Sequence, residues 1–289
     1  MKILLLGKNG QVGRKLLQIL AGLGEITAPA RQEMDLTDES AIRRKIRRLQ
    51  PDLIVNAAAY NFVDKAEEEE HLARTVNAVA PRILAEEAAR NQAALVHYST
   101  DYVFDGRARR PYKEDDLPNP LSVYGKTKLE GEMAIQEAGC AYLIFRTSWL
   151  YSLYRKNMLL TLLQLASEGK PLQVVDDQHG IPTWAGTVAA VTRAVLLQKP
   201  FQAGKAGLYN LTPSGETTWY HFAVRVIDHY QAITGRAVYL QAISTAEFPT
   251  AAKRPAYSVL CNEKIKRDFN LTLDSWERIL TELLKGISM

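Results

Sequence analysis

The sequence predicts an α/β protein in which helices cover both faces of one parallel sheet, a doubly wound arrangement. Three observations support this prediction. Short apolar runs alternate with longer segments of helical periodicity through residues 1–150. The apolar runs contain few polar residues, as strands buried on both faces do. The first run passes directly into a glycine-rich turn and then a helix, which is how such sheets commonly begin.

The first half of the chain is expected to supply five strands, at residues 3–6, 25–30, 51–59, 95–99 and 141–147. The helix after the second strand should begin behind Thr37 or Asp38, because either side chain can cap it. Its basic residues between 43 and 48 are expected to form a solvated face. Helices are also expected over 72–90 and 121–137, and Asn77 in the first of these should be buried, either as a structural amide or beside a ligand.

The second half of the chain is less regular. Helices are expected at 157–166, 187–197, 217–234, 262–269 and 275–284, and strands at 172–175 and 207–211. The last of these strands could extend the main sheet. We expect residues 1–150 to form one domain, to which segments near 178–212 return, and residues 151–289 to form mainly a second, ligand-binding region.

The composition excludes several classes of function. The 289 residues are 47% hydrophobic and 24% charged, with a net charge of +4, which is too small to indicate nucleic-acid binding. No segment is long and apolar enough to indicate a membrane span or a signal peptide. Cys140 and Cys261 lack metal-ligand spacing and the five histidines form no zinc motif. We therefore expect reduced thiols, a cytoplasmic location and no structural metal.

The turn after the first strand reads Gly7-Lys8-Asn9-Gly10-Gln11-Val12-Gly13. Free backbone N–H groups and the helix dipole at such a turn can hold a phosphate. The spacing G-x-x-G-x-x-G differs from the commoner G-x-G-x-x-G, and a tight turn without a ligand could use the same glycines. The third strand runs into Ala57-Ala58-Ala59, where small side chains suit either a flat ligand or close helix packing.

Arg31 follows the second strand, whose end lies beside the adenosine ribose of a dinucleotide in this kind of sheet. An acid there would bind the ribose 2′-hydroxyl, whereas an arginine accommodates a 2′-phosphate. The sequence therefore favours NADPH over NADH. If Arg31 is merely exposed, both cofactors would be used.

Tyr124 and Lys128 are four residues apart on an expected helix, so they share one face. A neighbouring ammonium is expected to lower the pKa of the phenol toward working pH. Such a tyrosine can exchange a proton with a carbonyl or alcohol oxygen. The same spacing also occurs by chance on solvated helices, and the rest of the chain decides between the two interpretations.

Together these blocks resemble the extended short-chain dehydrogenase/reductase family, which has a Rossmann fold. The resemblance covers nearly the whole chain and rests on the segments 7–13, 55–60, 64–67, 97–104, 123–128, 146–149, 177–183 and 253–255, in this order. Within the family, they are similar to enzymes that reduce the 4-keto group of dTDP-4-dehydro-L-rhamnose with NADPH or NADH. The resemblance thus implies a dTDP-sugar substrate and the last step of dTDP-L-rhamnose synthesis.

The resemblance also implies roles for single residues. It gives Thr100, Tyr124 and Lys128 the catalytic role, with Tyr124 as proton donor and Lys128 on the nicotinamide ribose. The expected substrate contacts are Thr100, Asp101, Trp149 and Arg254. The expected cofactor contacts, including Gly7 and Arg31 from the residue arguments above, are Gly7, Gly10, Gln11, Val12, Arg31, Asp35, Leu36, Ala59, Tyr60, Asn61, Tyr98, Tyr124 and Lys128.

The chain departs from the family pattern where some relatives carry carboxylates that hold Mg²⁺ at a dimer contact. Lys15 and Gly186 stand at those positions. We therefore expect no metal site, and a monomer or a dimer that does not need Mg²⁺. The alternative functions are another sugar-nucleotide ketoreductase, an epimerase or dehydratase of the same fold, and a non-catalytic NADP-binding regulatory subunit.

Overall fold

The computed structural model describes residues 1–286, and its centre is one six-stranded parallel sheet. The strands are β1 Lys2–Leu6, β2 Glu25–Thr27, β3 Leu53–Asn56, β4 Ala94–Thr100, β5 Ala141–Thr147 and β10 Gly207–Asn210. Their order is β10-β5-β4-β3-β1-β2. The predicted fold class is confirmed, and the strand expected near 207–211 does join the main sheet beside β5.

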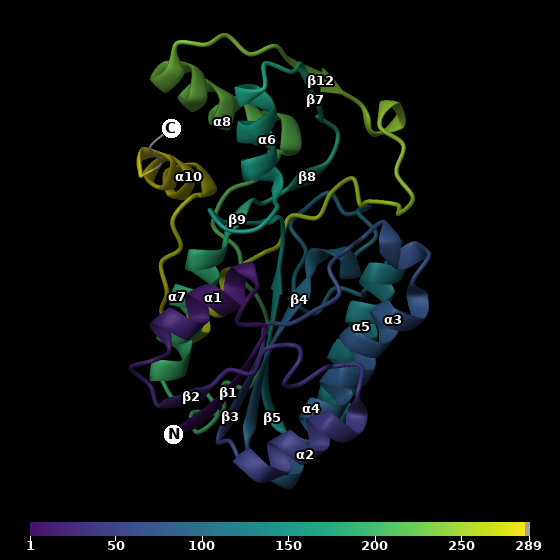
Figure 1. Ribbon diagram of the computed structural model, residues 1–289, viewed down its shortest axis with the longest axis vertical. Helices are drawn as coiled ribbons and strands as arrows, with labels where there is room; N and C mark the ends of the chain where they lie inside the picture. The colour runs from purple at the N-terminus through teal and green to yellow at the C-terminus, as the bar shows by residue number, and fades with distance from the viewer. Residues whose placement is uncertain (287–289) are drawn as a thin grey trace.

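Helices cover both faces of this sheet (Figure 1). On one face lie α1 Gln11–Ile19, α7 Ala185–Leu197 and α9 Glu263–Phe269, packed on alternate strand residues such as Leu5 and Val96. On the other face lie α2 Glu39–Leu49, α4 Ala80–Arg90 and α5 Val123–Glu137, packed on residues such as Leu4 and Ile54. The two-residue period of a strand divides the apolar run between the two cores.

Two predicted strands are shorter than expected. β2 ends at Thr27, and Pro29 follows shortly after, a residue that cannot donate to a β ladder. β3 ends at Asn56, so that Ala57-Ala58-Ala59 leave the ladder and are available to line a site.

The helix predicted over 72–90 is divided into three parts. α3 Glu70–Arg74 passes through a π-helical turn, Thr75–Val79, into α4. Such turns are rare and often mark functional sites.

The cap of α2 is Asp38, whose side chain accepts from the Ala41 N–H at 2.9 Å. Arg44, Arg47 and Arg48 of α2 are exposed, as expected of a solvated face. Arg43 and Arg47 additionally bind the buried carboxylate of Glu87, which the sequence did not indicate.

A second lobe stands beyond the carboxyl ends of the sheet strands (Figure 1). It contains α6 Met158–Ser167, α8 Trp219–Thr234 and α10 Trp276–Lys285, with β7 Leu172–Val175 paired in parallel to β12 Leu240–Ile243. β12 was not predicted from the sequence. Short pairs join the lobes: β6 Leu150–Tyr151 with β9 Thr183–Trp184, and β8 His179–Gly180 with β11 Thr217–Thr218. Short 3₁₀ helices lie at Lys65–Glu67, Asp101–Val103 and Thr245–Glu247. The division at residue 150 stays a prediction.

Candidate active site

The turn after β1 is shaped so that only glycine fits. Gly7 has a φ of +81°, and a Cβ there would lie 2.6 Å from the Ala57 carbonyl. A Cβ on Gly13 would lie 2.0 Å from the Gly7 oxygen. Gly10 precedes α1, which has no side-chain cap and no acid in its first turn. The amino end of α1 therefore offers free N–H groups to an anion.

A cavity of about 430 Å³ lies beside this turn. Its walls include the residues after β1 and after β3, the point where the strand order reverses and where ligands of such sheets bind. The predicted cofactor residues that line it are Gly7, Gly10, Arg31, Asp35, Leu36, Ala59, Tyr60 and Asn61. The cavity and the glycine turn fit the adenosine and phosphate parts of a dinucleotide.

Other predicted cofactor residues lie outside this lining. The side chain of Gln11 accepts from Ser152 Oγ at 2.7 Å, and Val12 is buried in the core under α1. The Tyr98 hydroxyl pairs with Thr192 Oγ1 at 2.8 Å. Their contacts with a cofactor stay predictions, as do those of Tyr124 and Lys128.

At the rim of the cavity Arg31 faces Asp35, with 3.4 Å between Arg31 Nε and Asp35 Oδ2. The hydrogen bond from the Thr37 N–H holds the pKa of Asp35 below its usual value, and the positive charge of Arg31 lowers it further. The side chain of Arg31 is 75% exposed. It is therefore free to turn toward a 2′-phosphate at little structural cost.

Asn77 holds the wall of the cavity. Its Oδ1 accepts from the Tyr60 N–H at 2.8 Å, and its Nδ2 donates to the Tyr60 carbonyl at 3.0 Å. The Asn77 side chain is buried in the π-helical turn. This turn packs closely against α5, since a Cβ on Gly131 would lie 2.2 Å from the backbone carbonyl oxygen of Asn77. Of the two roles that the sequence left open, Asn77 fills the structural one, on a segment that lines the cavity.

Thr100 and Tyr124 meet at the carboxyl end of β4. Thr100 is the last residue of β4, and its hydroxyl donates to Asp101 Oδ1 at 3.1 Å. Tyr124 lies in the first turn of α5, which Ser122 caps. Burial raises the pKa of Tyr124 to about 12, and a hydrogen bond with Thr100 opposes this. Tyr124 is therefore protonated at neutral pH and can act as a proton donor.

Lys128 is buried one helical turn beyond Tyr124, with 1% of its surface exposed. Its Nζ donates to the Tyr98 carbonyl at 2.6 Å and lies 3.2 Å from His97 Nε2. Burial lowers the pKa of Lys128 to about 8, and Glu132 raises it. The expectation that Lys128 lowers the pKa of Tyr124 is not met, because burial dominates at the phenol and the amine points to the β4 backbone.

The sequence analysis gave His97 no role, although a polar residue in a doubly buried strand must find partners. The Ala58 N–H donates to Asn56 Oδ1 at 3.2 Å, which leaves Asn56 Nδ2 as the donor to His97 Nδ1 at 3.1 Å. A neutral His97 that accepts at Nδ1 carries its hydrogen on Nε2, facing Lys128. Burial and Lys128 hold the pKa of His97 well below its usual value. His97 thus disfavours a charged Lys128.

The side expected to face the substrate holds several buried polar atoms. Asp101 is 2% exposed, and burial raises its pKa to about 7. Within residues 1–286, Asp101 Oδ2, Ser99 Oγ and Thr147 Oγ1 have no hydrogen-bond partner. Thr147 is the residue of β5 paired with Thr100 of β4. Unpaired buried polar atoms are uncommon and fit a polar ligand at these strand ends.

Trp149, expected to form a wall for the sugar, lies in a stack. Its ring is parallel to that of Trp219, with centroids 3.8 Å apart and an angle of 7°. A Cβ on Gly180 would come within 2.4 Å of the Trp149 ring, so Gly180 also packs closely against it. Trp219 had no role in the sequence analysis, and no local motif marks it. A contact between the sugar and Trp149 stays a prediction.

Arg254, expected to bind substrate, forms a bidentate pair with Asp64. The two distances are 3.1 Å to Oδ1 and 2.7 Å to Oδ2. The pair joins the segment after β3 to the segment that precedes α9, two of the blocks on which the family resemblance rested. The side chain of Arg254 is 21% exposed. A contact between Arg254 and the substrate stays a prediction.

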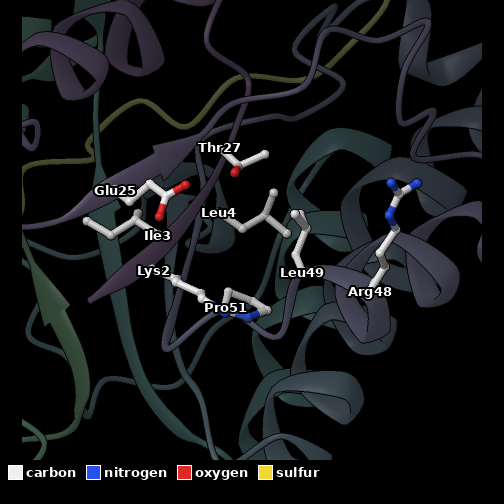
Figure 2. Close-up of a pocket in the computed structure, with 8 residues that line it drawn as sticks. All are labelled: Lys2, Ile3, Leu4, Glu25, Thr27, Arg48, Leu49 and Pro51. Atoms are coloured by element: carbon white, nitrogen blue, oxygen red, sulfur yellow. The ribbon is translucent and has the colours of Figure 1, made fainter.

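A smaller cavity of about 250 Å³ lies at the start of β1 and β2 (Figure 2). Glu25, Arg48 and Thr27 are among its lining residues, and none of the predicted site residues is. Parallel sheets bind ligands at the opposite, carboxyl ends of their strands. We assign this cavity no function.

Within residues 1–286, no group of three or more His, Cys, Asp or Glu side chains is arranged to hold a metal. Lys15 Nζ lies 5.8 Å from the centre of the Trp184 ring, and a Cβ on Gly186 would lie 2.5 Å from the same ring. The two positions where relatives carry acids therefore flank an aromatic side chain. No helix in the described part of the chain is long and apolar enough to cross a membrane.

Comparisons with known proteins agree with this geometry. The family model of the RmlD substrate binding domain matches residues 1–289. The dTDP-4-dehydrorhamnose reductase of Salmonella typhimurium is 44% identical over 296 residues, with 98% of each chain covered. That of Burkholderia thailandensis is 41% identical over 284 residues, covering 96% of this chain and 95% of the relative. A solved dTDP-4-dehydrorhamnose reductase from Bacillus anthracis, in complex with NADP, has a TM-score of 0.90, 32% identity and 99% coverage of each chain.

Proposed function

The chain belongs to the RmlD substrate binding domain family, and on this premise we propose that it reduces dTDP-4-dehydro-L-rhamnose to dTDP-L-rhamnose with NADPH. The observation that supports the proposal most directly is the meeting of Thr100 with Tyr124 at the end of β4. Tyr124 also packs against the cluster that contains Tyr60, and Tyr60 lines the cofactor cavity. The protein is an NADPH-dependent oxidoreductase, as its relatives are.

The residues fit the cofactor. The glycine turn leaves no room for a Cβ at Gly7 or Gly13, and the amino end of α1 has free donors for the pyrophosphate. When bound, NADPH would supply a hydride to C4 of the sugar. Asn77 holds the Tyr60 segment at the cavity wall, and Arg31, which lines the same cavity, would bind the 2′-phosphate.

The proton comes from Tyr124. Its pKa of about 12 keeps the phenol protonated until negative charge develops on the C4 oxygen. Thr100, at the end of β4, would hold the same oxygen in line. Lys128, with a pKa of about 8, would face the nicotinamide ribose, the role that the family resemblance implies for it. His97 and the Tyr98 carbonyl position the Lys128 amine.

The substrate is placed from the other side. The unpaired oxygens of Asp101 and Thr147 are available to the sugar hydroxyls, and the Trp149–Trp219 stack supplies an apolar boundary that excludes water. We further propose a cytoplasmic location, since both cysteines are free thiols. We also propose a monomer, or a dimer independent of Mg²⁺, because Lys15 and Gly186 replace the acids.

The function is tested by incubating the purified protein with NADPH and dTDP-4-dehydro-L-rhamnose. NADPH oxidation is followed by its absorbance, and the product is identified by NMR. The proposal expects one dTDP-L-rhamnose for each NADPH consumed. Turnover of a 4-hydroxy nucleotide sugar without net loss of NADPH would instead indicate an epimerase.

A further inference from the structure

One residue of the cofactor cavity comes from the second half of the chain. The lining runs from Leu6 to Val76, and Arg155 alone joins it from beyond. We propose that Arg155 binds a phosphate of the dinucleotide pyrophosphate, so that the substrate-side lobe takes part in holding the cofactor. This inference rests on the proposed function, because it needs a dinucleotide in the cavity.

Arg155 belongs to a short segment, 152–157, between β6 and α6, and α1 fixes this segment in place. Gln11 Oε1 accepts from Ser152 Oγ at 2.7 Å and from Asn157 Nδ2 at 3.2 Å. Asn157 Nδ2 also donates to the Arg155 carbonyl at 2.9 Å. The guanidinium of Arg14 lies 4.2 Å from the centre of the Tyr154 ring. The segment is thus tied to the first turn of the helix whose amino end faces the cavity.

The backbone of Arg155 is in an unusual conformation. Its φ of +64° lies in the left-handed region, which residues other than glycine seldom adopt. A strained backbone persists where the surrounding structure holds it, and such residues cluster at binding sites. Here the Arg155 carbonyl accepts from Asn157 Nδ2, and the N–H of the preceding Tyr154 donates to Ser152 Oγ at 3.1 Å.

The charge of Arg155 is uncompensated, unlike that of Lys8 and Arg31, two of the other three cations that line the cavity. Lys8 Nζ lies 3.8 Å from Glu33 Oε2, and Arg31 Nε lies 3.4 Å from Asp35 Oδ2. In residues 1–286, no carboxylate lies within 4.0 Å of a charged nitrogen of Arg155, as no ion pair includes it. A guanidinium with no acidic partner at a cavity wall suits a phosphate, which it can bind through two hydrogen bonds.

NADPH has two anionic parts that an arginine could bind, the pyrophosphate and the 2′-phosphate. The position of the segment favours the pyrophosphate. Ser152 and Asn157, which flank Arg155, both bind Gln11, the first residue of α1. The amino end of that helix is where a pyrophosphate binds in such sheets. Arg31, after β2, is already placed on the ribose side.

The experiment measures dissociation constants of NADP⁺ and NAD⁺ by calorimetry for wild type, Arg155→Ala, Arg155→Lys and Lys156→Ala. Lys156 is the matched control, an exposed neighbouring cation outside the cavity lining. Because both nucleotides carry the pyrophosphate, Arg155→Ala should weaken both by the same factor, roughly tenfold for one charge-assisted pair. Arg155→Lys should fall between, and Lys156→Ala should match wild type. Thermal unfolding of each variant checks that the fold is kept.

Two results would overturn the inference while the cofactor assignment stands. Unchanged affinity of Arg155→Ala for both nucleotides would show that Arg155 does not touch the cofactor. A loss confined to NADP⁺ would place Arg155 on the 2′-phosphate instead. If the wild type bound neither nucleotide, the proposed function itself would be wrong, and the inference would fall with it.

Discussion

His97 and Lys128 lie 3.2 Å apart in the buried centre of the site, and the ring nitrogen that faces the amine carries the hydrogen. This relationship gives Lys128, the lysine for which we propose a catalytic role, its environment. The Tyr98 carbonyl accepts from the amine, while His97 and burial disfavour its charge. The pKa of Lys128, about 8, is therefore close to working pH, and we expect its titration to affect the pH profile of the reaction.

We expect His97→Leu to weaken both the fold and the reaction. The substitution leaves Asn56 Nδ2 without its partner in a buried place, and each such group costs about 1–3 kcal/mol. Urea unfolding measures this loss, and steady-state assays should show a lower kcat and a changed pH profile, since Lys128 loses a neighbour. His71→Leu, at an exposed histidine, is the control. A variant with wild-type stability and an unchanged pH profile would remove His97 from this role.

Asp101→Asn should change how stability depends on pH. The pKa of Asp101 is raised from 3.8 to about 7, so between these values the folded state binds more protons than the unfolded state. Wild-type stability due to this group therefore falls as pH rises through that window, at up to about 1.4 kcal/mol per pH unit. The variant lacks this titration. Its free energy of unfolding should therefore rise relative to that of the wild type as the pH increases from 4 to 7.

This prediction is measured by thermal unfolding of the wild type and Asp101→Asn between pH 4 and 7. Asp38→Asn, at an exposed helix cap, serves as the control, because asparagine caps a helix as well as aspartate does. Curves for wild type and Asp101→Asn that stay parallel would show that the Asp101 carboxyl has an ordinary pKa in the folded protein.

Trp149 and Trp219 should act as a unit toward the substrate. Because the rings stack 3.8 Å apart, loss of Trp219 removes the surface that holds Trp149 in place. We expect Trp149→Ala and Trp219→Ala each to raise the KM for the nucleotide sugar severalfold, with affinity for NADP⁺ unchanged. If only Trp149→Ala raises KM, the stack does not position Trp149. If both variants merely lose thermal stability, the pair is a structural contact.

Arg31→Ala tests the choice of cofactor. Arg31 is mostly exposed and its contact with Asp35 is long, so its removal should cost little stability. The preference for NADPH over NADH should shrink, chiefly through a higher KM for NADPH, because a charge-assisted contact with the 2′-phosphate is lost. Steady-state assays with both cofactors on both proteins decide this. Equal use of NADH by the wild type, or an unchanged preference in the variant, would rule out Arg31 as the selector.

The sequence was informative where local rules dominate. The buried strands, the glycine turn and the Asp38 cap follow from periodicity and from single-residue chemistry, and the structure has them. The Tyr124–Lys128 spacing, together with the family resemblance, predicted the centre of the candidate site. These features need only residues close in the chain, so the pattern could predict them.

The remaining features depend on residues far apart in the chain. His97 acquires its role from Asn56 and Lys128, and Trp219 from Trp149, which lies 70 positions before it in the sequence. Arg155 reaches the cofactor cavity only because Gln11 holds its segment. The pKa of Tyr124 was misjudged for the same reason. Burial by several elements outweighs a charge one helical turn away.

The most direct test of the account is the rate of NADPH oxidation with dTDP-4-dehydro-L-rhamnose in Tyr124→Phe beside Tyr102→Phe. The two rings are neighbours, 5.7 Å apart, so the second variant makes the same substitution in the same surroundings. If Tyr124 is the proton donor, Tyr124→Phe should lose about 10²–10⁴-fold in kcat while its affinity for NADP⁺ stays that of the wild type. Tyr102→Phe should keep most of its turnover. Near wild-type turnover in Tyr124→Phe would contradict the account.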